Sequence, residues 1–238
     1  MSEVMLSVDS LTVKYGDMIA VDNVSMVIHQ GEMVSVLGPN SSGKTTLMNT
    51  IAGLISPQRG EIVLQGQPLT GLSSDKIVEL GVSLVPQGGR CFGRMSVLDN
   101  LMVGSYSRKA RHSAKSSLNR VYELFPVLHE KKDQPAGSLS GGQRQMVAIG
   151  RALMSCPRLL LFDELSLGLA PVVIKDIYSA IKQISREENT TIVMVEQDTK
   201  RAMSMTDYTY IMLKGTVVLE GRSAELSDDA VKKAYFGS

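Results

Sequence analysis

A strand-like run leads directly into a glycine-rich turn at residues 33–46, Met33-Val34-Ser35-Val36-Leu37-Gly38-Pro39-Asn40-Ser41-Ser42-Gly43-Lys44-Thr45-Thr46. Leu47, Ile51 and Leu54 continue at helical spacing, so the sequence predicts a strand, a loop and a helix in that order. Residues 38–45 fit the pattern G-x-x-x-x-G-K-[ST], in which backbone amides and a helix N-terminus bind phosphate groups. This segment predicts a nucleotide-binding α/β protein.

The side chains of this loop have separate expected roles. We expect the nine residues from Gly38 to Thr46 to surround the phosphates, with Lys44 reaching the β- and γ-phosphates. The Thr45 hydroxyl is expected to bind Mg²⁺. A structural glycine turn is the alternative, and the flanking strand and helix argue against it.

Two carboxylates follow the apolar run Leu159–Phe162. Asp163 suits Mg²⁺, directly or through water, and Glu164 suits a general base that polarises the water attacking a γ-phosphate. Taken alone, an acidic pair is often an ordinary strand end or helix cap. The loop at Lys44 favours the functional interpretation.

Four predicted strands end in polar or glycine residues that could meet. They would bring Gly38, Gln87, Asp163 and Gln197 to the carboxyl edge of one sheet, where open α/β folds bind ligands. Gln87 is expected to bind Mg²⁺ or to position water, with an ordinary loop glutamine as the alternative.

Other segments predict an antiparallel region, a helical insertion and further βα units. Turn signals at Tyr15-Gly16-Asp17 and His29-Gln30-Gly31-Glu32 predict antiparallel strands and hairpins within residues 4–36. Between about Ser96 and Pro135 the apolar residues follow a helical period, which predicts an inserted helical lobe. Strands and helices then alternate, and a hairpin around Lys214-Gly215 precedes a short helix.

The composition restricts the class of protein. Of 238 residues 43% are hydrophobic and 21% charged, which is ordinary for a globular chain. The net charge of +1 gives no general footprint for nucleic acid, so we expect no nucleic-acid partner. No signal peptide is evident, and no apolar run approaches the roughly 18 residues of a spanning helix. We therefore expect a cytoplasmic protein whose two cysteines are reduced.

A second glycine-rich helix start carries the clearest resemblance. Leu139-Ser140-Gly141-Gly142-Gln143 opens a predicted helix and resembles the signature of the ABC ATPase family, in that family's order relative to Lys44 and Asp163. The resemblance implies a P-loop NTPase of ABC type, with a mixed sheet core, an antiparallel β subdomain and an inserted α-helical subdomain. We assign residues 1–95 and 136–238 to the first two and about 96–135 to the helical subdomain, within one domain.

The same resemblance implies an ATPase that uses ATP and Mg²⁺ and works as a head-to-tail dimer. Residues Ser140, Gly141, Gly142 and Gln143 would contact the ATP held by the partner's Lys44 loop. Tyr15 would lie on adenine, with a simple turn tyrosine as the alternative. Gln87 would be the hinge glutamine beside the groove for the membrane subunit, which Cys91, Phe92, Arg94 and Met95 are expected to line.

Several residues depart from the usual family pattern. Ser41-Ser42 replace Gly-Ala, Leu165 replaces a proline, and Ala170 stands where aspartate is frequent. Gln197 replaces the histidine that contacts the γ-phosphate. An amide donates that hydrogen bond but does not titrate, so we expect no ionisation near the histidine pKa of about 6.5 in the ATPase rate.

Three features resemble the shorter ATPase subunit of branched-chain amino acid importers. They are Gln197, the loop Ser166–Pro171 and the ending Lys232-Lys233-Ala234-Tyr235-Phe236-Gly237. This resemblance implies permease partners, a second ATPase that is typically non-identical, and indirectly a solute-binding protein, with attachment to the inner face of the membrane. Alternatives are a urea or short-amide importer, a soluble ABC ATPase without a transport role, and a nucleotide-binding module without turnover.

Overall fold

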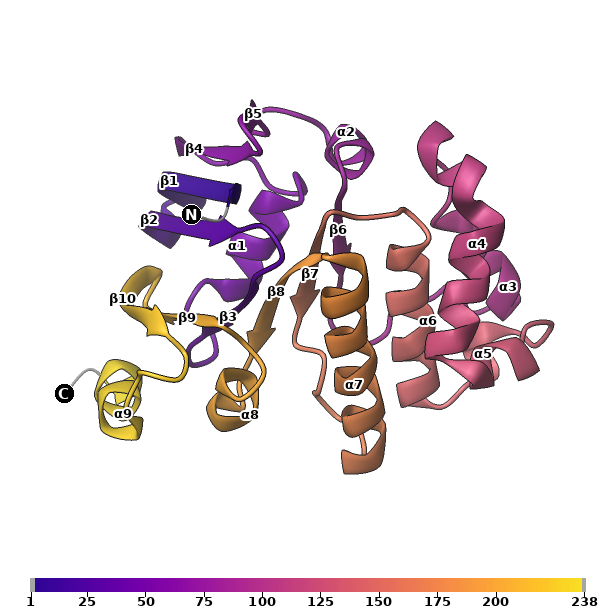
Figure 1. Ribbon diagram of the computed structural model, residues 1–238. Coiled ribbons are helices and arrows are strands. Elements are labelled where there is room, and N and C mark those ends of the chain that lie inside the picture. Colours follow the sequence, from indigo (N-terminus) through magenta and orange to yellow (C-terminus); the bar gives the residue numbers. More distant parts are fainter. Residues whose placement is uncertain (1–2, 237–238) are drawn as a thin grey trace.

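A six-stranded sheet forms the centre of the computed structural model, which describes residues 3–236 (Figure 1). Gly237 of the C-terminal motif lies outside the described residues. The strand order is β10-β9-β3-β8-β7-β6, and all neighbours are parallel except β9 and β10. The strands are β3 (Met33–Leu37), β6 (Val82–Val85), β7 (Leu159–Asp163), β8 (Thr191–Glu196), β9 (Tyr208–Leu213) and β10 (Thr216–Arg222). Every residue of β3, β7 and β8 is buried, as expected for parallel strands covered on both faces.

A four-stranded antiparallel sheet lies beside the central sheet. Its order is β2-β1-β4-β5, formed by β1 (Val4–Tyr15), β2 (Met18–His29), β4 (Arg59–Leu64) and β5 (Gln67–Pro68). The expected hairpin at Gly16-Asp17 is confirmed, since β1 pairs with β2.

The second expected hairpin, at residues 29–32, is wrong. This turn carries the chain from β2 in one sheet to β3 in the other. The Gly31 N–H donates to the Thr191 hydroxyl, and the Glu32 carbonyl accepts from the Ile192 N–H, which aligns β3 with β8. Every residue of β3 is buried and all but Ser35 are apolar, which fits a strand inside a sheet that is covered on both faces.

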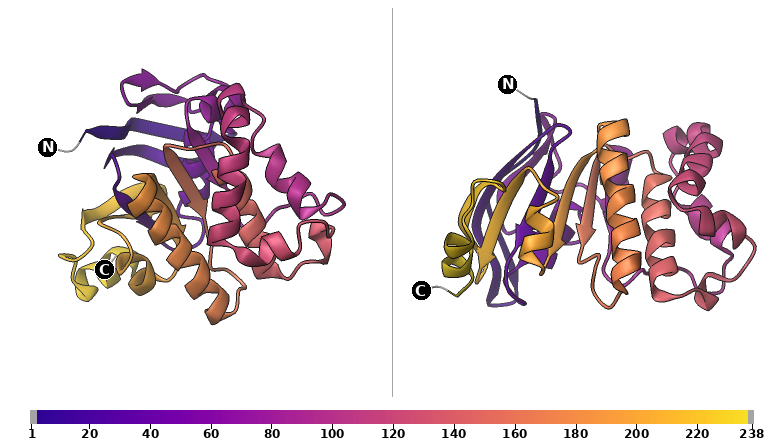
Figure 2. Two further views of the ribbon diagram at one scale, coloured as in Figure 1. Left: turned by 45° about the vertical axis from the view of Figure 1, so that its right-hand side comes forward. Right: turned by 60° about the horizontal axis from the view of Figure 1, so that its bottom comes forward.

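Helices cover both faces of the central sheet (Figure 2). On one side, α1 (Lys44–Ile51) contributes Leu47, Met48 and Ile51 to a core shared with the antiparallel sheet. On the other side, α6 (Gly141–Leu153) and α7 (Pro171–Glu188) pack on β6, β7 and β8. The predicted βα alternation is therefore confirmed.

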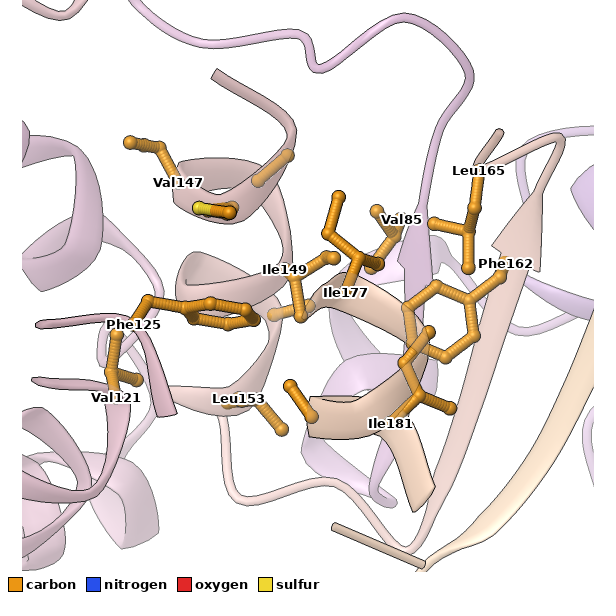
Figure 3. Packing of buried hydrophobic residues seen from close by; sticks show 14 of the residues in the cluster. Val85, Val121, Phe125, Val147, Ile149, Leu153, Phe162, Leu165, Ile177 and Ile181 are labelled. Carbon is orange, nitrogen blue, oxygen red and sulfur yellow. The ribbon is translucent and has the colours of Figure 1, made fainter. Parts of the chain in front are cut away.

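The segment between β6 and α6 is helical, with α3 (Val97–Val103), α4 (Arg108–Leu124), α5 (Pro126–Glu130) and a 3₁₀ turn at Ala136–Ser138. A β-bridge joins Ser96 to Pro135, which brings the two ends of this segment together. Val121 of α4 and Phe125, the residue that follows α4, extend the core of α6 and α7 outward, so the segment packs onto the sheet through α6 (Figure 3).

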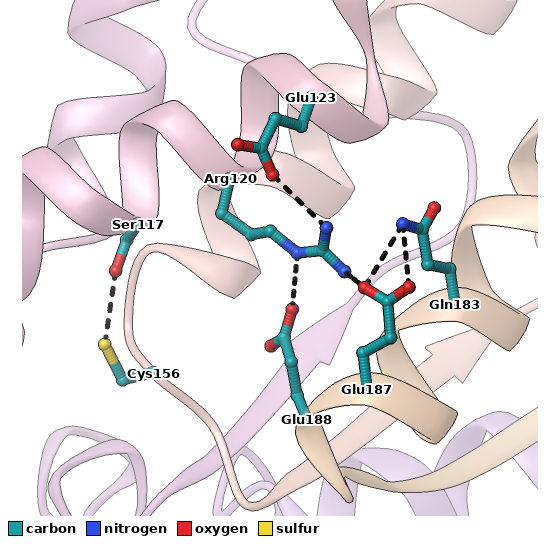
Figure 4. A network of polar contacts seen from close by, with 7 residues as sticks. All are labelled: Ser117, Arg120, Glu123, Cys156, Gln183, Glu187 and Glu188. Carbon is teal, nitrogen blue, oxygen red and sulfur yellow. Dashed lines mark hydrogen bonds and ion pairs between the residues drawn. The ribbon is translucent and has the colours of Figure 1, made fainter.

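An ion-pair cluster joins α4 to the C-terminal end of α7 (Figure 4). The Arg120 guanidinium lies 2.6 Å from Glu187 and 2.9 Å from Glu188, and 3.3 Å from Glu123 on its own helix. These groups are partly exposed, so we assign them alignment of α4 with α7 and a modest stabilisation.

Three short helices complete the described chain: α2 (Ser74–Glu79), α8 (Thr199–Met203) and α9 (Asp228–Phe236). The helix α9 was expected. A small apolar cluster holds α9 against the sheet edge and α8, and its buried members are Leu37, Ala202, Ile211 and Val231.

Candidate functional site

The carboxyl ends of β3, β8, β7 and β6 form one edge of the central sheet. Because these strands are parallel neighbours, the residues that follow them lie side by side. Hydrogen bonds join Gln87 and Gln197 to Glu164, and Asp163 to the loop after β3. The structure therefore brings together all four strand ends that the sequence indicated.

The loop after β3 holds its lysine folded inward. Gly43 has φ of 98° at the N-cap of α1, and a Cβ there would clash with the Ala20 carbonyl. The Lys44 side chain is 4% exposed, and its Nζ donates to the carbonyls of Gly38 at 2.9 Å and Pro39 at 2.8 Å. Burial lowers the pKa of Lys44, while Glu164 and Asp163 oppose this shift.

Asp163 faces this loop from the end of β7. The Thr45 Oγ1 donates to Asp163 Oδ1 at 3.0 Å. Burial raises the pKa of Asp163, while the Thr45 hydrogen bond lowers it and Glu164 raises it further. Within residues 3–236 no cluster of three His, Cys, Asp or Glu side chains could hold a metal. A hydroxyl and one carboxylate instead fit Mg²⁺, which completes its coordination with water and phosphate oxygens.

Glu164 receives an amide hydrogen bond on each oxygen. Gln87 Nε2 donates to Oε2 and Gln197 Nε2 donates to Oε1, both at 2.9 Å. The Glu164 backbone adopts φ of 50°, in the left-handed region that side-chain-bearing residues rarely occupy, and its N–H donates to the Val195 carbonyl. The backbone is thus turned sharply where β7 ends, and the carboxylate lies between two flanking strand ends.

Tyr15 lies at the end of β1 beside the same loop. Its hydroxyl is 3.4 Å from Thr46 Oγ1, and 47% of the residue is exposed. An exposed ring tethered at its hydroxyl end is compatible with stacking on a nucleobase.

The Ser140 turn has a different environment. Ser140 caps α6 by accepting from the Gln143 N–H, and the Gln143 side chain accepts from the Ser140 N–H, which is a capping box. Gly142 is buried against Val173 of α7, where a Cβ would clash. Ser140 and Gly141 are exposed, and no hydrogen bond in the described part of the chain joins this turn to the Lys44 loop. Within one chain the two glycine-rich helix starts remain separate.

Two of the departures from the family pattern have clear structural settings. Leu165 is 1% exposed and fills the core beside Phe162 (Figure 3). Ala170 occupies the N-cap of α7, which has no side-chain cap, and Pro171 begins the helix. The chain therefore exchanges a turn-forming proline for apolar packing, and lacks the cap that an aspartate would provide.

A cavity of about 730 Å³ opens next to this site. Its lining includes Thr45, Gln87 and Asp163 at the strand ends and Tyr106 in the helical segment. Four residues are expected to line the groove for a membrane subunit but are not among those that line this cavity, so that expectation stays a prediction: Cys91, Phe92, Arg94 and Met95. The side chain of Asn100 binds the N–H and the carbonyl of Phe92, which turns that segment toward α3.

Sequence patterns did not point to two further polar contacts near the site. Glu196, 2% exposed at the end of β8, accepts from Ser166 at 2.7 Å and from Tyr178 at 2.6 Å. Glu196 thereby holds the loop that follows Glu164 close to Gln197. The second contact joins the Gly38 N–H to the Tyr235 hydroxyl at 2.9 Å. An acid ending a buried strand was a usable signal for Glu196, whereas no local pattern links residues 38 and 235.

Residues 21–166 match the family described as ABC transporter. The high-affinity branched-chain amino acid transport ATP-binding protein BraG of Pseudomonas aeruginosa is 40% identical, over 98% of this chain and 100% of that protein. LivG of Escherichia coli K12, which carries the same description, is 31% identical over 100% of this chain and 99% of that protein.

Solved structures agree with these sequence likenesses. An ATP-binding cassette of an ABC transporter in its ADP conformation aligns with a TM-score of 0.85 and 28% identity, covering 99% of both chains. A dimeric cassette in a post-hydrolysis state with ADP and phosphate aligns with a TM-score of 0.77 and 27% identity, over 92% of this chain and 99% of that one. The expected fold class is confirmed.

Proposed function

Because the chain belongs to the ABC transporter family, we propose that it hydrolyses ATP to drive an importer of branched-chain amino acids. The observation that carries the ATPase assignment is the meeting of Thr45 with Asp163, and of Gln87 and Gln197 with Glu164, at one sheet edge. The solute assignment is supported by the names of BraG and LivG, which this chain resembles over nearly its whole length.

In this proposal each polar group of the site has a separate role in phosphoryl transfer. Lys44 keeps its two carbonyl acceptors and, with the third donor of its ammonium group, binds the phosphates together with the amides of the loop. Glu164 accepts a proton from the attacking water, which Gln197 and Gln87 orient. Thr45 and Asp163, with Gln87, would hold Mg²⁺, whose charge offsets that of the phosphate oxygens. Tyr15 supports the adenine.

We propose that residues 96–135 form a helical subdomain and that the two flanking parts form the catalytic core with its antiparallel β subdomain. The bridge at Ser96 and Pro135 and the local packing of α3, α4 and α5 support this division. Arg120 then connects the helical subdomain to α7. The cavity between Gln87 and Tyr106 lies where the two parts meet and suits a segment of a permease.

We propose a second ATPase subunit as partner in a head-to-tail dimer, because the exposed Ser140 turn needs a triphosphate from outside its own chain. Pseudomonas aeruginosa has two relatives with this transport description, BraG at 40% identity and BraF at 31%. The closer likeness to BraG supports a mixed pair. Permease subunits and, through them, a solute-binding protein complete the importer, and the small net charge supports no role for nucleic acid.

Among the residues that the structure describes, no helix is long and apolar enough to cross a membrane. We propose that permease subunits attach the chain to the cytoplasmic face of the membrane.

The substitution Glu164→Gln tests the proposal in the complex that co-purifies with this chain. It removes the base and keeps the phosphate contacts, so phosphate release should fall on the order of a hundredfold to ten-thousandfold, while ATP still binds. Glu61→Gln, at an exposed position of β4, is the matched control and should retain full turnover. Wild-type hydrolysis by Glu164→Gln would overturn the role of Glu164. Loss of urea uptake with intact leucine uptake in cells carrying that variant would overturn the solute assignment.

A further inference from the structure

The C-terminal helix contacts the nucleotide loop through one polar group. The Gly38 N–H donates to the hydroxyl of Tyr235 on α9, at 2.9 Å and across 197 residues of sequence. Burial raises the pKa of Tyr235, so its hydroxyl stays neutral at physiological pH and can accept this bond. The contact lies at the first residue of the loop, where β3 ends.

The rest of the α9 interface is apolar. Tyr235 packs with Leu226 and Ala234 against a cluster that includes Leu37 and Ile211. Leu37 is the last residue of β3 and precedes Gly38. The Tyr235 hydroxyl is therefore a specific polar contact within a docking surface that apolar side chains hold in place.

The C-terminal hairpin contacts the same loop at a second point. The N–H of Gly215, between β9 and β10, donates to the Ser42 carbonyl at 3.1 Å. Gly38 also packs against the Met212 carbonyl so closely that a Cβ would clash there. Residues 208–236 thus support the loop near both of its ends.

The bond to Tyr235 acts on the residue that holds Lys44. The carbonyl of Gly38 accepts from Lys44 Nζ at 2.9 Å, while the N–H of the same residue is held by Tyr235. If the N–H were released, the Gly38 backbone could rotate and Lys44 would lose its position. The loop would then spend less time in the conformation that binds phosphate, and the apparent affinity would fall in proportion.

We propose that Tyr235 is a positioning residue for nucleotide binding: its hydroxyl holds Gly38 and so keeps the Lys44 loop in its phosphate-binding conformation. This inference rests on the nucleotide site proposed above. It gives a role to the ending Lys232–Gly237, which the proposed chemistry does not otherwise use.

Tyr235→Phe in the full chain tests this inference, because the ring and its apolar packing remain while the hydroxyl is removed. Loss of one hydrogen bond should raise the dissociation constant of a fluorescent ATP analogue by about twofold to tenfold. Hydrogen exchange should show faster exchange of the Gly38 amide without nucleotide, with unchanged protection in β3.

Tyr210→Phe is the matched control. The Tyr210 hydroxyl also binds backbone, accepting from the Val27 N–H at 3.1 Å and donating to the Val27 carbonyl at 2.9 Å, and it does not contact the Lys44 loop. This variant should lower thermal stability and leave the dissociation constant unchanged.

Unchanged affinity and unchanged Gly38 exchange in Tyr235→Phe would overturn the inference, and so would equal weakening by both variants. A different result would show that the proposed nucleotide site is wrong: the wild-type chain would then bind the analogue no better than Lys44→Ala does.

Discussion

Two helices of this chain begin at glycine-rich turns, yet the turns differ in what surrounds them. The turn before α1 is closed by Lys44 on its own carbonyls and faces Asp163 and Glu164. The turn before α6 satisfies its first amides with a capping box and leaves Ser140 exposed. Both present the positive end of a helix.

The difference separates a complete site from half of one. The α1 turn has a cation and two acids of the same chain around the space that a nucleotide would fill. The α6 turn has backbone donors and a hydroxyl, but in the described chain its partners are its own residues. We propose that the first binds a triphosphate with residues of its own chain, whereas the second contributes when another chain supplies the ligand.

Among the variants that distinguish the two turns, Lys44→Ala should cause the largest loss of ATP affinity. Removing a charge-assisted contact to phosphate is expected to weaken ATP binding by the isolated chain by about tenfold to hundredfold. Titration with a fluorescent ATP analogue measures this change. Affinity equal to that of the wild type would mean that the α1 turn does not bind the phosphates.

Acid pH should weaken magnesium-dependent ATP binding at the α1 turn and leave the α6 turn unaffected. Because burial raises the pKa of Asp163, this side chain gains its proton at a higher pH than an ordinary aspartate of pKa about 3.9, and the neutral acid no longer binds Mg²⁺. Magnesium-dependent ATP affinity should therefore rise with pH through the Asp163 pKa and lose about a factor of ten for each unit below it. Isothermal titration at a series of pH values tests this.

Asp163→Asn is the control for that titration, since its affinity should be low throughout and lack the acid step. Because Gln197 does not ionise, the ATPase rate of the wild-type chain should show no step near the histidine pKa of about 6.5 that depends on this residue. A step there that Gln197→Ala abolishes would contradict the pH-independent role of Gln197.

Ser140→Ala should have the smallest effect on the isolated chain. Loss of the N-cap is expected to cost about 1 kcal/mol of unfolding free energy and to lower the Tm by about 2–4 °C. The ATP affinity of the single chain should stay unchanged, while phosphate release by the assembled dimer falls. Calorimetry measures the change in Tm, the same fluorescent titration measures the ATP affinity of the single chain, and phosphate release measures turnover by the dimer. Weaker ATP binding by the single chain would mean that the two turns act on one nucleotide within one chain.

Much of this fold was predictable because its signals are local. The strand, loop and helix at residues 33–51 and the apolar run at Leu159–Phe162 predict that the Lys44 loop and the two acids follow strands of one parallel sheet, in which β8 lies between β3 and β7. The meeting of four strand ends then follows from parallel pairing. The strand β5 and the helix α8 were not predicted, since two and five residues are too few to establish a period.

The remaining features depend on contacts between distant segments. The turn at residues 29–32 has the composition of a hairpin, and only the pairing of β3 with β8 and β9 shows that it connects two sheets. The pairing of both amides with Glu164 requires three loops to meet within hydrogen-bond distance. The contact between Gly38 and Tyr235 likewise has no local signal in the sequence.

The two amides on Glu164 have a consequence for the chain before ATP arrives. Each carboxylate oxygen accepts one amide hydrogen bond and keeps a further lone pair, so a water molecule can still bind Glu164 beside the two amides. The strand ends of β6 and β8 therefore fix the orientation of the proposed base before a nucleotide binds. The attacking water would then meet a carboxylate whose rotamer is already set.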